Sequence, residues 1–452
     1  MGNARVHPLL LEISSIFASA GKQAFLVGGA VRDLLRGETP KDWDLATDAL
    51  PEEVMKLFRR VIPTGIKHGT VSILYKGLSI ETTTFRTESG YSDGRRPDDV
   101  RYAATIEEDL SRRDFTMNAV AIELPSLRVV DPFGGRRDIQ DRLVRCVGDP
   151  AERFAEDGLR PLRAARFVAQ LDFRLDEPSL YAIPFALGTT ARVAVERVRD
   201  EITKTLAAPR PSTAFLIMER TGLLELELPE LAACRGVDQR GFHRYDVLDH
   251  SLYSCDGAPR DSLVVRLAAL LHDVGKPEVR EPGEDGTWRF YRHEEASTRI
   301  ARGILLRLRF PTSIIDTVVH LVSQHMFNYD DSWTDAAVRR FIVRVGESNL
   351  DALYALRRAD LFGTAGETAP SPALAELVAR VDLALAERGA LSMKDLAVNG
   401  EDLAGIGVTR GPRMGAILKE LLETVLDDPA MNEKDLLLEV ARRMEEGKAG
   451  SR

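Results

Sequence analysis

One short stretch near the N-terminus limits what this chain can fold into: "LVGGAVRDLLRGETPKDWDLAT", residues 26–47. Its first apolar residues predict a short strand, which ends in the pair Gly28 and Gly29, and a short helix follows. A glycine pair between a strand and a helix lets the backbone approach a ligand, and the helix N-terminus directs unpaired N–H groups at an anion. Arg32 lies on the first turn of that helix. The stretch therefore predicts a phosphate site.

The same stretch contains two acids one residue apart, Asp42 and Asp44. If "DWDLAT" is a strand, its period of two places both carboxylates on one face and Trp43 on the other. Two adjacent carboxylates repel each other unless a cation lies between them, and oxygen ligands favour Mg²⁺. Alone, a glycine pair is more often a simple turn, and such acids are often solvated. Their order along the chain is more specific and predicts a nucleoside triphosphate bound with its metal.

Composition restricts the class of protein. The chain has 452 residues, of which 44% are hydrophobic and 29% charged, so we expect a soluble protein of about three domains. No apolar run is long enough for a membrane span, and the N-terminus reads as a helix rather than a signal peptide. The three widely spaced cysteines, Cys146, Cys234 and Cys255, are typical of a reducing compartment. These features predict a cytoplasmic protein.

The net charge of −9 means that any nucleic acid must be met by local basic patches. Two arginine-rich segments qualify, residues 86–113 and 153–174. Because solvated helix faces also carry arginine, charge alone leaves RNA binding open.

Secondary-structure patterns change near residue 149. Before it, strands and helices alternate, with a hairpin predicted for "TVSILYKG" and "LSIETTTFR" and a mobile loop over Thr87–Asp98. After it, the pattern is helical almost throughout. Breaks near residues 210, 235–245 and 364–373 are candidate boundaries. We therefore expect four parts: 1–148, 149–235, 236–365 and 366–452.

The motifs "LVGGAVRD", "DWDLAT", "RRDFTMNAVA", "DPFGG" and "EDGLRPLRAARF" resemble, in order and spacing, those of class II tRNA nucleotidyltransferases. This family comprises the CCA-adding enzymes and their bacterial poly(A) polymerase relatives, and the resemblance covers about residues 20–230. It implies an α+β fold: a polymerase-β-like nucleotidyltransferase head with a mixed sheet, followed by all-α neck, HD and tail domains. It also implies template-independent addition of CMP and AMP, from CTP and ATP, to the tRNA 3′ acceptor end with Mg²⁺.

The resemblance assigns roles to particular residues. It implies metal binding and catalysis by Asp42 and Asp44, and a role for Arg113 at the nucleotide. A surface ion pair is the alternative for residues 112–114. The other implied nucleotide-binding residues are Gly28, Gly29 and Arg32 at the triphosphate, Asp114 and Asn118 near the ribose, and Asp157, Arg160, Arg163 and Arg166 near the base.

The motif "EDGLRPLRAARF" reads as one helix, with Asp157, Arg160 and Arg163 on a shared face. The family resemblance implies that Asp157 and Arg160 read the base. A carboxylate accepts from the exocyclic amine of cytosine or adenine, and a guanidinium donates to the adjacent ring nitrogen. Guanine and uracil would be mismatched at both places. Gly158 stands where the family more often has Ala or Pro, so we expect a looser helix start. An exposed arginine-rich helix is the alternative.

In this family, a flexible loop at the position of Thr87–Asp98 is required for the final AMP addition. The loop is full length here, which disfavours addition of CC alone. It does not separate a CCA-adding enzyme from one that adds only A, and poly(A) synthesis also stays open. A nucleotide-sensing module with dead sites is disfavoured because both acids of "DWD" are present.

Six of the eight histidines lie between residues 243 and 325. The segments "VLDHS", "LLHDVGKP", "YRHEE" and "VSQHM" resemble HD metal-dependent phosphohydrolases. The alternatives are an HD module kept only for packing or RNA support, and an HD module that carries the main activity. His243 and His320 have no motif position, and Asp360 is a further candidate ligand. The resemblance implies a mono- or binuclear site for Ni²⁺, Co²⁺ or Mn²⁺ made by His250, His272, Asp273, His293 and His325.

The C-terminal segment "GVTRGPRMGAIL" places Arg410 and Arg413 at a glycine-rich helix start. Backbone N–H groups at such a start can bind RNA phosphate. In the family that this chain resembles, the body and tail hold tRNA, so the resemblance implies that this tail does so. A purely structural cap is the alternative. No DNA or membrane partner is expected, and the sequence leaves the oligomeric state open.

Overall fold

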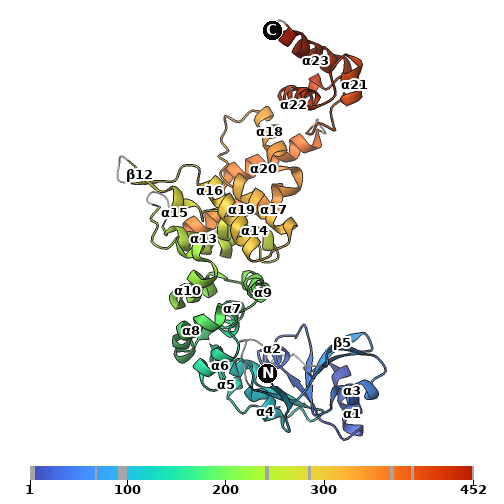
Figure 1. Ribbon diagram of the computed structural model, residues 1–452, viewed down its shortest axis with the longest axis vertical. Helices are drawn as coiled ribbons and strands as arrows, with labels where there is room; N and C mark the ends of the chain where they lie inside the picture. The colour runs from blue at the N-terminus through green and yellow to red at the C-terminus, as the bar shows by residue number, and fades with distance from the viewer. Residues whose placement is uncertain are drawn as a thin grey trace. The chain divides into compact units, whose positions relative to one another are not determined.

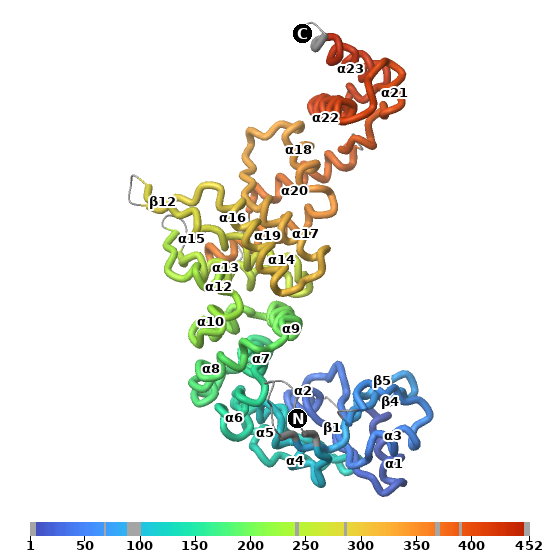
Figure 2. The backbone as a smooth tube through the Cα atoms, in the orientation of Figure 1, coloured from blue at the N-terminus to red at the C-terminus, as the bar shows by residue number. Residues whose placement is uncertain are grey.

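The computed structural model describes residues 6–66, 69–89, 99–239, 244–283, 287–366, 371–387 and 391–449. The chain divides into two compact units (Figures 1 and 2). The first unit comprises Met1–Gly236 with Gly303–Phe310, and the second comprises Val237–Arg302 with Pro311–Arg452. Among the described helices, none is both long enough and apolar enough to cross a membrane.

The first unit is built on a seven-stranded mixed sheet with the strand order β3-β4-β5-β2-β1-β8-β9. The pair β2–β5 is parallel and the other pairs are antiparallel, which confirms the predicted mixed sheet. The predicted hairpin forms as well, with Tyr75 opposite Leu78 across a two-residue turn. The strands are β1 Ala24–Val27, β2 Asp44–Thr47, β3 Val61–Gly65, β4 Thr70–Tyr75, β5 Leu78–Thr84, β8 Ala121–Leu124 and β9 Val129–Val130.

Both faces of the central strands are buried, which explains why β1 reads as a continuous apolar run. Leu26 belongs to the hydrophobic cluster that includes residues of α1 (Pro8–Ser19) and α3 (Pro51–Leu57). Phe25 belongs to the opposite cluster, which includes residues of α4 (Ile106–Ser111). Alternate side chains of a strand point to opposite faces, so a strand covered on both faces needs apolar residues throughout.

Two sequence expectations for this unit were wrong in detail. Strand β2 begins at Asp44, so Asp42 lies in a bend before the strand rather than on its face. The expected loop from Thr87 begins later, because β6 (Arg86–Ser89) pairs with β7 (Asp99–Tyr102) in an antiparallel ribbon. The rest of that predicted loop, residues 90–98, lies outside the described residues.

From residue 149 onward the chain is helical almost throughout, as predicted. The rest of the first unit places its helices around α7, which packs against α9 and α10. A short parallel pair, β10 (Leu143–Val144) with β11 (Arg174–Leu175), ties the end of the sheet region to α7. The helices of this part are α6 Pro150–Glu156, α7 Arg160–Leu171, α8 Glu177–Thr190, α9 Val195–Leu206, α10 Ser212–Thr221, α11 Leu223–Glu227 and α12 Pro229–Ala232. The remaining helices of the sheet region are α2 Gly29–Leu35, the 3₁₀ helix η2 Thr116–Asn118 and α5 Gly135–Gln140.

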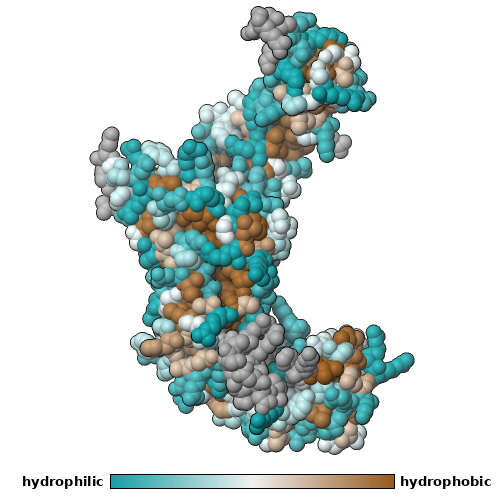
Figure 3. Space-filling view, in the orientation of Figure 1, coloured by the Kyte–Doolittle hydropathy of each residue, from teal (hydrophilic) through white to brown (hydrophobic). Residues whose placement is uncertain are grey.

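Among its described residues, the second unit is helical apart from a small antiparallel pair, β12 (Glu281–Pro282) with β13 (Trp288–Arg289). Helix α13 packs along α19, and α14 contacts α17 and α19. Hydrophilic residues predominate on the visible surface (Figure 3), in keeping with the high charged fraction. The helices are α13 Val247–Gly257, α14 Leu263–Leu271, α15 Lys276–Val279, α16 His293–Arg307, α17 Thr312–Gln324, α18 Asp335–Val345, η3 Glu347–Asn349, α19 Leu350–Ala365, α20 Pro372–Ala386, α21 Gly400–Gly405, α22 Pro412–Asp427, η4 Pro429–Met431 and α23 Lys434–Ala449.

Candidate functional site

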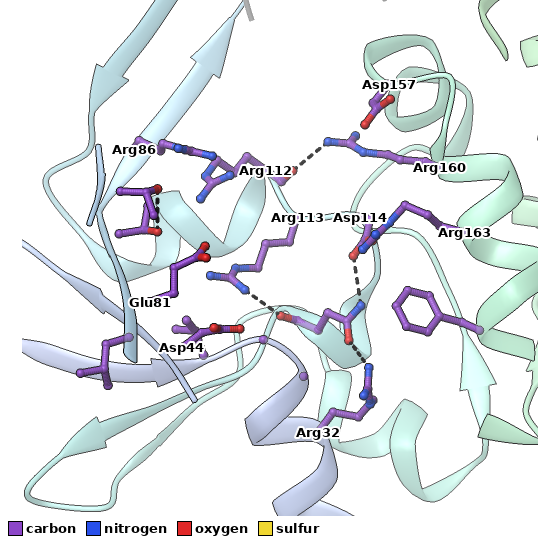
Figure 4. Close-up of a pocket in the computed structure, with 18 of the residues that line it drawn as sticks. Arg32, Asp44, Glu81, Arg86, Arg112, Arg113, Asp114, Asp157, Arg160 and Arg163 are labelled. Carbon is purple, nitrogen blue, oxygen red and sulfur yellow. Dashed lines mark hydrogen bonds and ion pairs between the residues drawn. The ribbon is translucent and has the colours of Figure 1, made fainter. Parts of the chain in front are cut away.

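A pocket of about 720 Å³ in the first unit gathers most of the predicted nucleotide-binding residues. They come from four separate segments of the chain and face one another across the pocket (Figure 4). Asp42 and Arg166 are not among the lining residues. The predicted residues that line it are Gly28, Gly29, Arg32, Asp44, Arg113, Asp114, Asn118, Asp157, Arg160 and Arg163.

The glycine pair forms one wall of this pocket. Gly28 has φ 71°, a conformation that L-residues rarely adopt, and directly precedes α2. A Cβ atom at Gly28 would lie 3.4 Å from Arg113 Nη1 and 3.5 Å from Asp44 Oδ2. Arg32, on α2, is only 7% exposed and donates from Nη1 to Asn118 Oδ1 at 3.0 Å. The backbone and a guanidinium are thus both held at the pocket, as the sequence pattern predicts.

The acids of the pocket come from two strands. The parallel register of β2 and β5 places Asp44 opposite Glu81, and both line the pocket. Burial and the negative charge of Glu81 raise the pKa of Asp44 to about 6, with Arg113 opposing them and Asp42 adding to them. Mutually destabilising carboxylates of this kind suit a divalent cation with oxygen ligands. Asp42 is exposed and lies before the strand, close enough to Asp44 to act on its charge.

Sequence reasoning missed Glu81. The acid stands in the strand segment "LSIETTT", among apolar residues and threonines. Its closeness to Asp44 depends on parallel pairing of β2 with β5, two strands that are not consecutive in the chain. An acid within a β-branched run is the only signal that could have marked it.

The motif around residue 113 forms a buried polar cluster rather than a surface ion pair. Arg112 and Arg113 both donate to Asp109, whose side chain is 1% exposed. Burial alone would raise the pKa of Asp114, but the ion pair with Arg163, 2.6 Å away, lowers it to about 2. Asp114 Oδ1 also accepts from Asn118 Nδ2 at 3.2 Å. The motif therefore links the pocket wall to α7.

The expectation that Asp157 lies on the same helix as Arg160 was wrong. Helix α6 ends at Glu156, Asp157 has φ −137°, and α7 begins at Arg160. The reason stands in the sequence: Pro161 has no N–H, and its ring would clash with the carbonyl of residue 157 in a continuous helix. At the first turn of a new helix the same proline is well accommodated.

Both base-reading candidates nevertheless line the pocket, each held by a partner that sequence reasoning missed. Asp157 accepts two bonds from Arg197, at 2.8 and 3.2 Å. Arg160 donates to Glu156 Oε2 at 2.5 Å and to the carbonyl of Arg112 at 3.1 Å. Arg197 comes from α9, so only the packing of α9 against α7 brings it to this place.

Gly158 is required for close packing, contrary to the expected loose helix start. A Cβ atom there would lie 2.5 Å from the carbonyl oxygen of Thr189. We expect Gly158→Ala to lower the free energy of unfolding by about 2 kcal/mol, the cost of overpacking, as measured by urea titration. Gly188→Ala is the matched control, because Gly188 lies in α8 with no neighbour in reach of a Cβ. Equal stability of the two variants would contradict this assignment.

Arg166, predicted to lie near the base, does not line the pocket. Its Nε donates to Glu201 Oε2 at 2.5 Å, and its guanidinium lies 3.9 Å from the centre of the Phe167 ring. The structure therefore gives Arg166 a supporting place behind the pocket, and Phe167 lines the pocket instead.

The second unit brings the five predicted HD residues together, all of them buried. Asp273 lies at the centre: its Oδ2 is 3.4 Å from His250 Nε2 and 3.3 Å from His272 Nε2. Its Oδ1 is 3.2 Å from His293 Nε2 and 3.8 Å from His325 Nε2. Two groups of three donors that share one carboxylate have the composition of a binuclear metal site.

The orientation of the histidine rings supports metal binding. Three rings hydrogen-bond a backbone carbonyl through Nδ1: His272 at 2.8 Å, His293 at 3.0 Å and His325 at 2.7 Å. When Nδ1 donates to a carbonyl, the Nε2 lone pair is free to bind a metal. These rings present Nε2 to one another and to Asp273, as ligands of a shared site would.

Asp360 joins this cluster, with Oδ1 3.2 Å from His250 Nε2 and 3.7 Å from His272 Nε2. Burial alone would lower the pKa of His272, but the charges of Asp273 and Asp360 raise it to about 10. The cluster thus favours positive charge at its centre. His320 lies outside it and contacts the carbonyl of Val345 at 2.7 Å, and His243 lies outside the described residues.

The two tail arginines differ. Arg413 turns toward α23, donating to Glu445 at 2.6 Å and to the carbonyl of Met444 at 3.0 Å. Arg410 is mostly exposed and lies 3.4 Å from the exposed Glu401. Arg413 thus has a packing role within the tail, whereas Arg410 faces solvent.

Comparison with known proteins finds family models that match three segments of the chain. Residues 24–145 match the model of the poly A polymerase head domain, residues 172–235 that of the probable RNA and SrmB-binding site of polymerase A, and residues 240–383 that of the HD domain. These matches define a nucleotidyltransferase with an HD domain.

The chain belongs to the family of CCA-adding enzymes. The CCA-adding enzyme of Lactobacillus johnsonii is 34% identical over 432 residues, which cover 96% of this chain and 95% of that protein. The solved structure of the Bacillus stearothermophilus CCA-adding enzyme in complex with CTP has a TM-score of 0.75 at 28% identity, covering 99% of this chain and all of that one. The fold is also shared with the Thermotoga maritima enzyme complexed with tRNA, at 21% identity, a TM-score of 0.61 and 97% coverage of each chain.

Proposed function

We propose that this enzyme builds and repairs the CCA end of tRNA, using CTP and ATP and releasing pyrophosphate. The observation that carries the proposal is the convergence of four segments, around residues 28–32, 44, 113–118 and 157–163, on one pocket. Its walls combine acids for a metal, arginines for phosphates, and an acid–arginine pair for a base.

In the proposed reaction, the RNA 3′-hydroxyl oxygen forms a bond to the α-phosphorus as the bond to the β-phosphate oxygen breaks. Mg²⁺ bound by Asp42, Asp44 and Glu81 would stabilise the attacking and leaving oxygens. Arg32 and Arg113 neutralise charge on the triphosphate, and the backbone at Gly28 lets it approach. The hydroxyl proton leaves to solvent or to a nearby carboxylate.

The proposal is tested with tRNA transcripts that end at the discriminator base, at C or at CC. Each is offered CTP, ATP or both, and products are resolved by gel electrophoresis. We expect each transcript to be completed to CCA and not extended further. Extension of the CC-ended transcript alone would establish an A-adding enzyme instead, and long A tails on unrelated RNA would establish a poly(A) polymerase.

We further propose that Asp157 and Arg160 select the base. An asparagine at position 157 would offer an N–H donor to the O4 atom of uracil, which a carboxylate repels. We therefore expect Asp157→Asn to raise the use of UTP relative to CTP by about tenfold, as one lost discriminating bond allows, measured as the ratio of kcat/KM values. Glu152→Gln, an exposed acid on α6, is the control. An unchanged ratio would remove Asp157 from base selection.

A second activity is favoured by the buried cluster around Asp273. We propose that the second unit binds two transition-metal ions, such as Ni²⁺, Co²⁺ or Mn²⁺, and hydrolyses phosphate esters. A metal there would activate water for attack on phosphorus. Lys276 Nζ lies 2.6 Å from Asp273 Oδ2 and adds a positive charge beside the proposed metal site. Hydrolysis of phosphomonoesters or 2′,3′-cyclic nucleotides by the metal-loaded protein tests this activity.

For the organisation of the chain, we propose a head at 1–148, a neck at 149–235, an HD domain at 236–365 and an RNA-binding tail at 366–452. The separation of the two compact units at Gly236 supports the middle boundary. We also propose a cytoplasmic location, supported by three buried, free cysteines.

A further inference from the structure

A chain of polar contacts runs along the pocket wall from Arg32 to Arg163. Arg32 Nη1 donates to Asn118 Oδ1 at 3.0 Å, and Asn118 Nδ2 donates to Asp114 Oδ1 at 3.2 Å. Asp114 Oδ2 accepts from Arg163 at 2.6 Å from Nη2 and 2.8 Å from Nε. Figure 4 shows Arg163 beside Asp114, with Arg32 on the same side of the pocket. A side chain on α7 is therefore linked to one on α2.

The chain continues to Glu201 on α9, which does not line the pocket and is only 2% exposed. Its Oε2 accepts from Arg166 Nε at 2.5 Å, and its Oε1 lies 3.8 Å from Arg163 Nη1. Lys204, at 3.2 Å, is its third cation. A buried carboxylate must keep its partners close, because an unpaired buried charge is costly. Glu201 therefore restrains Arg163 and Arg166, two of the three arginines of α7.

Three arginines of this network of contacts, Arg32, Arg163 and Arg166, lie near the ring of Phe167. The guanidinium carbons lie 3.9 Å from its centre for Arg166, 5.4 Å for Arg163 and 5.5 Å for Arg32. Attraction to one ring holds like charges near one another, and Glu201 supplies the negative charge that offsets them. Without that charge, Arg166 and Arg163 would repel each other, and this repulsion would displace Arg163 from its position against Asp114.

We propose that Glu201 is a positioning residue for nucleotidyl transfer: by fixing Arg163, and through it Asp114 and Asn118, it directs Arg32 toward the triphosphate. The inference rests on the proposed function. Arg32 stays in the pocket when Glu201 is neutralised, so binding of the nucleotide changes little while the alignment needed for transfer is lost. The effect is therefore expected in kcat more than in KM.

A double-mutant cycle between Glu201 and Asn118 tests this coupling. None of the interactions described above joins the two residues directly, so any coupling between them must pass through Arg163 and Asp114. CMP addition to tRNA ending at the discriminator base is measured for Glu201→Gln, Asn118→Ala and the double variant. We expect each single change to lower kcat about tenfold, with KM for CTP within about twofold for Glu201→Gln, which does not line the pocket. Without the Asn118 side chain, the network of contacts between Glu201 and Arg32 is interrupted. The kcat of the double variant should therefore lie within about twofold of that of Asn118→Ala.

Two further variants separate positioning from folding. Glu201→Asp retains the charge and should recover most of kcat, whereas Glu196→Gln, an exposed acid of α9 paired with Arg309, should change neither constant. Thermal unfolding checks that each variant is folded. Should Glu201→Gln fail to fold, the cycle is run with Glu201→Asp, whose smaller loss should also vanish in the Asn118→Ala background.

If the two single losses in kcat multiplied to about a hundredfold in the double variant, the inference would be overturned. A Glu201→Gln protein with the kcat of the parent would also overturn it. In both cases the parent protein still adds CMP, so the proposed function stands. A parent protein that adds no CMP to any transcript overturns the proposed function and this inference with it.

Discussion

Asp44→Asn should lower CMP and AMP transfer by at least about a thousandfold, because it removes a central oxygen ligand of the proposed Mg²⁺ site. Asp44 is a half-buried acid of the pocket that faces both Glu81 and Arg113. The measurement is single-turnover addition to tRNA at saturating CTP. Asp42→Asn should have a similar effect on transfer. Both variants should retain phosphohydrolase activity, since the proposed HD site uses other residues.

The matched control for Asp44→Asn is Glu52→Gln, an exposed acid on the first turn of α3. It removes one negative charge from the same unit at a distance from the pocket, so transfer should remain within about twofold of the parent. If the Asp44→Asn protein transferred CMP at the parental rate, Asp44 would not be a ligand of the catalytic metal.

The same substitution should stabilise the metal-free protein at high pH. The pKa of Asp44 is raised to about 6 in the folded state, chiefly by burial and by Glu81. The folded state therefore holds its proton more tightly, and this stabilisation is complete below about pH 4 and lost as the pH rises through about 6. At pH 8, Asp44→Asn should raise the free energy of unfolding by about 3 kcal/mol, from a pKa raised from its ordinary value of 3.8 to about 6 at about 1.36 kcal/mol per pKa unit. At pH 4 the difference should vanish.

Added Mg²⁺ provides the complementary measurement for Asp44. The parent protein should gain thermal stability with Mg²⁺ at pH 8 and much less at pH 5, because binding requires the ionised carboxylates. The Asp44→Asn variant should show a smaller gain at either pH. Equal stabilisation of both proteins would place the metal elsewhere.

Asp273→Asn should lower the affinity of the second unit for Mn²⁺ or Ni²⁺ by at least about a hundredfold, since loss of even an outer-shell partner costs 10- to 100-fold. Asp273 is the one carboxylate shared by both groups of donors. Hydrolysis of phosphate esters should be lost with the metal, while CMP transfer stays within about twofold of the parent. Metal content after dialysis and calorimetric titration provide the measurement.

His320→Gln is the matched control for Asp273→Asn. This imidazole lies in the same unit but contacts the carbonyl of Val345 and not the cluster, so metal affinity should be unchanged. Thermal unfolding in EDTA shows whether the Asp273→Asn protein is folded. Parental metal affinity in a folded Asp273→Asn protein would exclude the proposed binuclear site.

Local patterns predicted the elements that local physics controls. The glycine pair before α2, Pro51 at the start of α3 and the two-residue turn between β4 and β5 each act within a few residues. The break before α7 belongs with them, because Pro161 excludes a continuous helix through Asp157 by local sterics. That signal was present in the sequence and was overlooked in favour of helical spacing.

The sequence by itself predicted most of the residues that line the pocket and all five that meet in the buried cluster around Asp273, together with their order along the chain. Only the tertiary structure decided their partners: Glu81 beside Asp44, Arg197 on Asp157, and Glu201 behind Arg163. Each of these contacts joins segments about forty residues apart and depends on strand register or helix packing. Local spacing contains no information on such pairings, because they follow from how distant apolar faces are buried against one another.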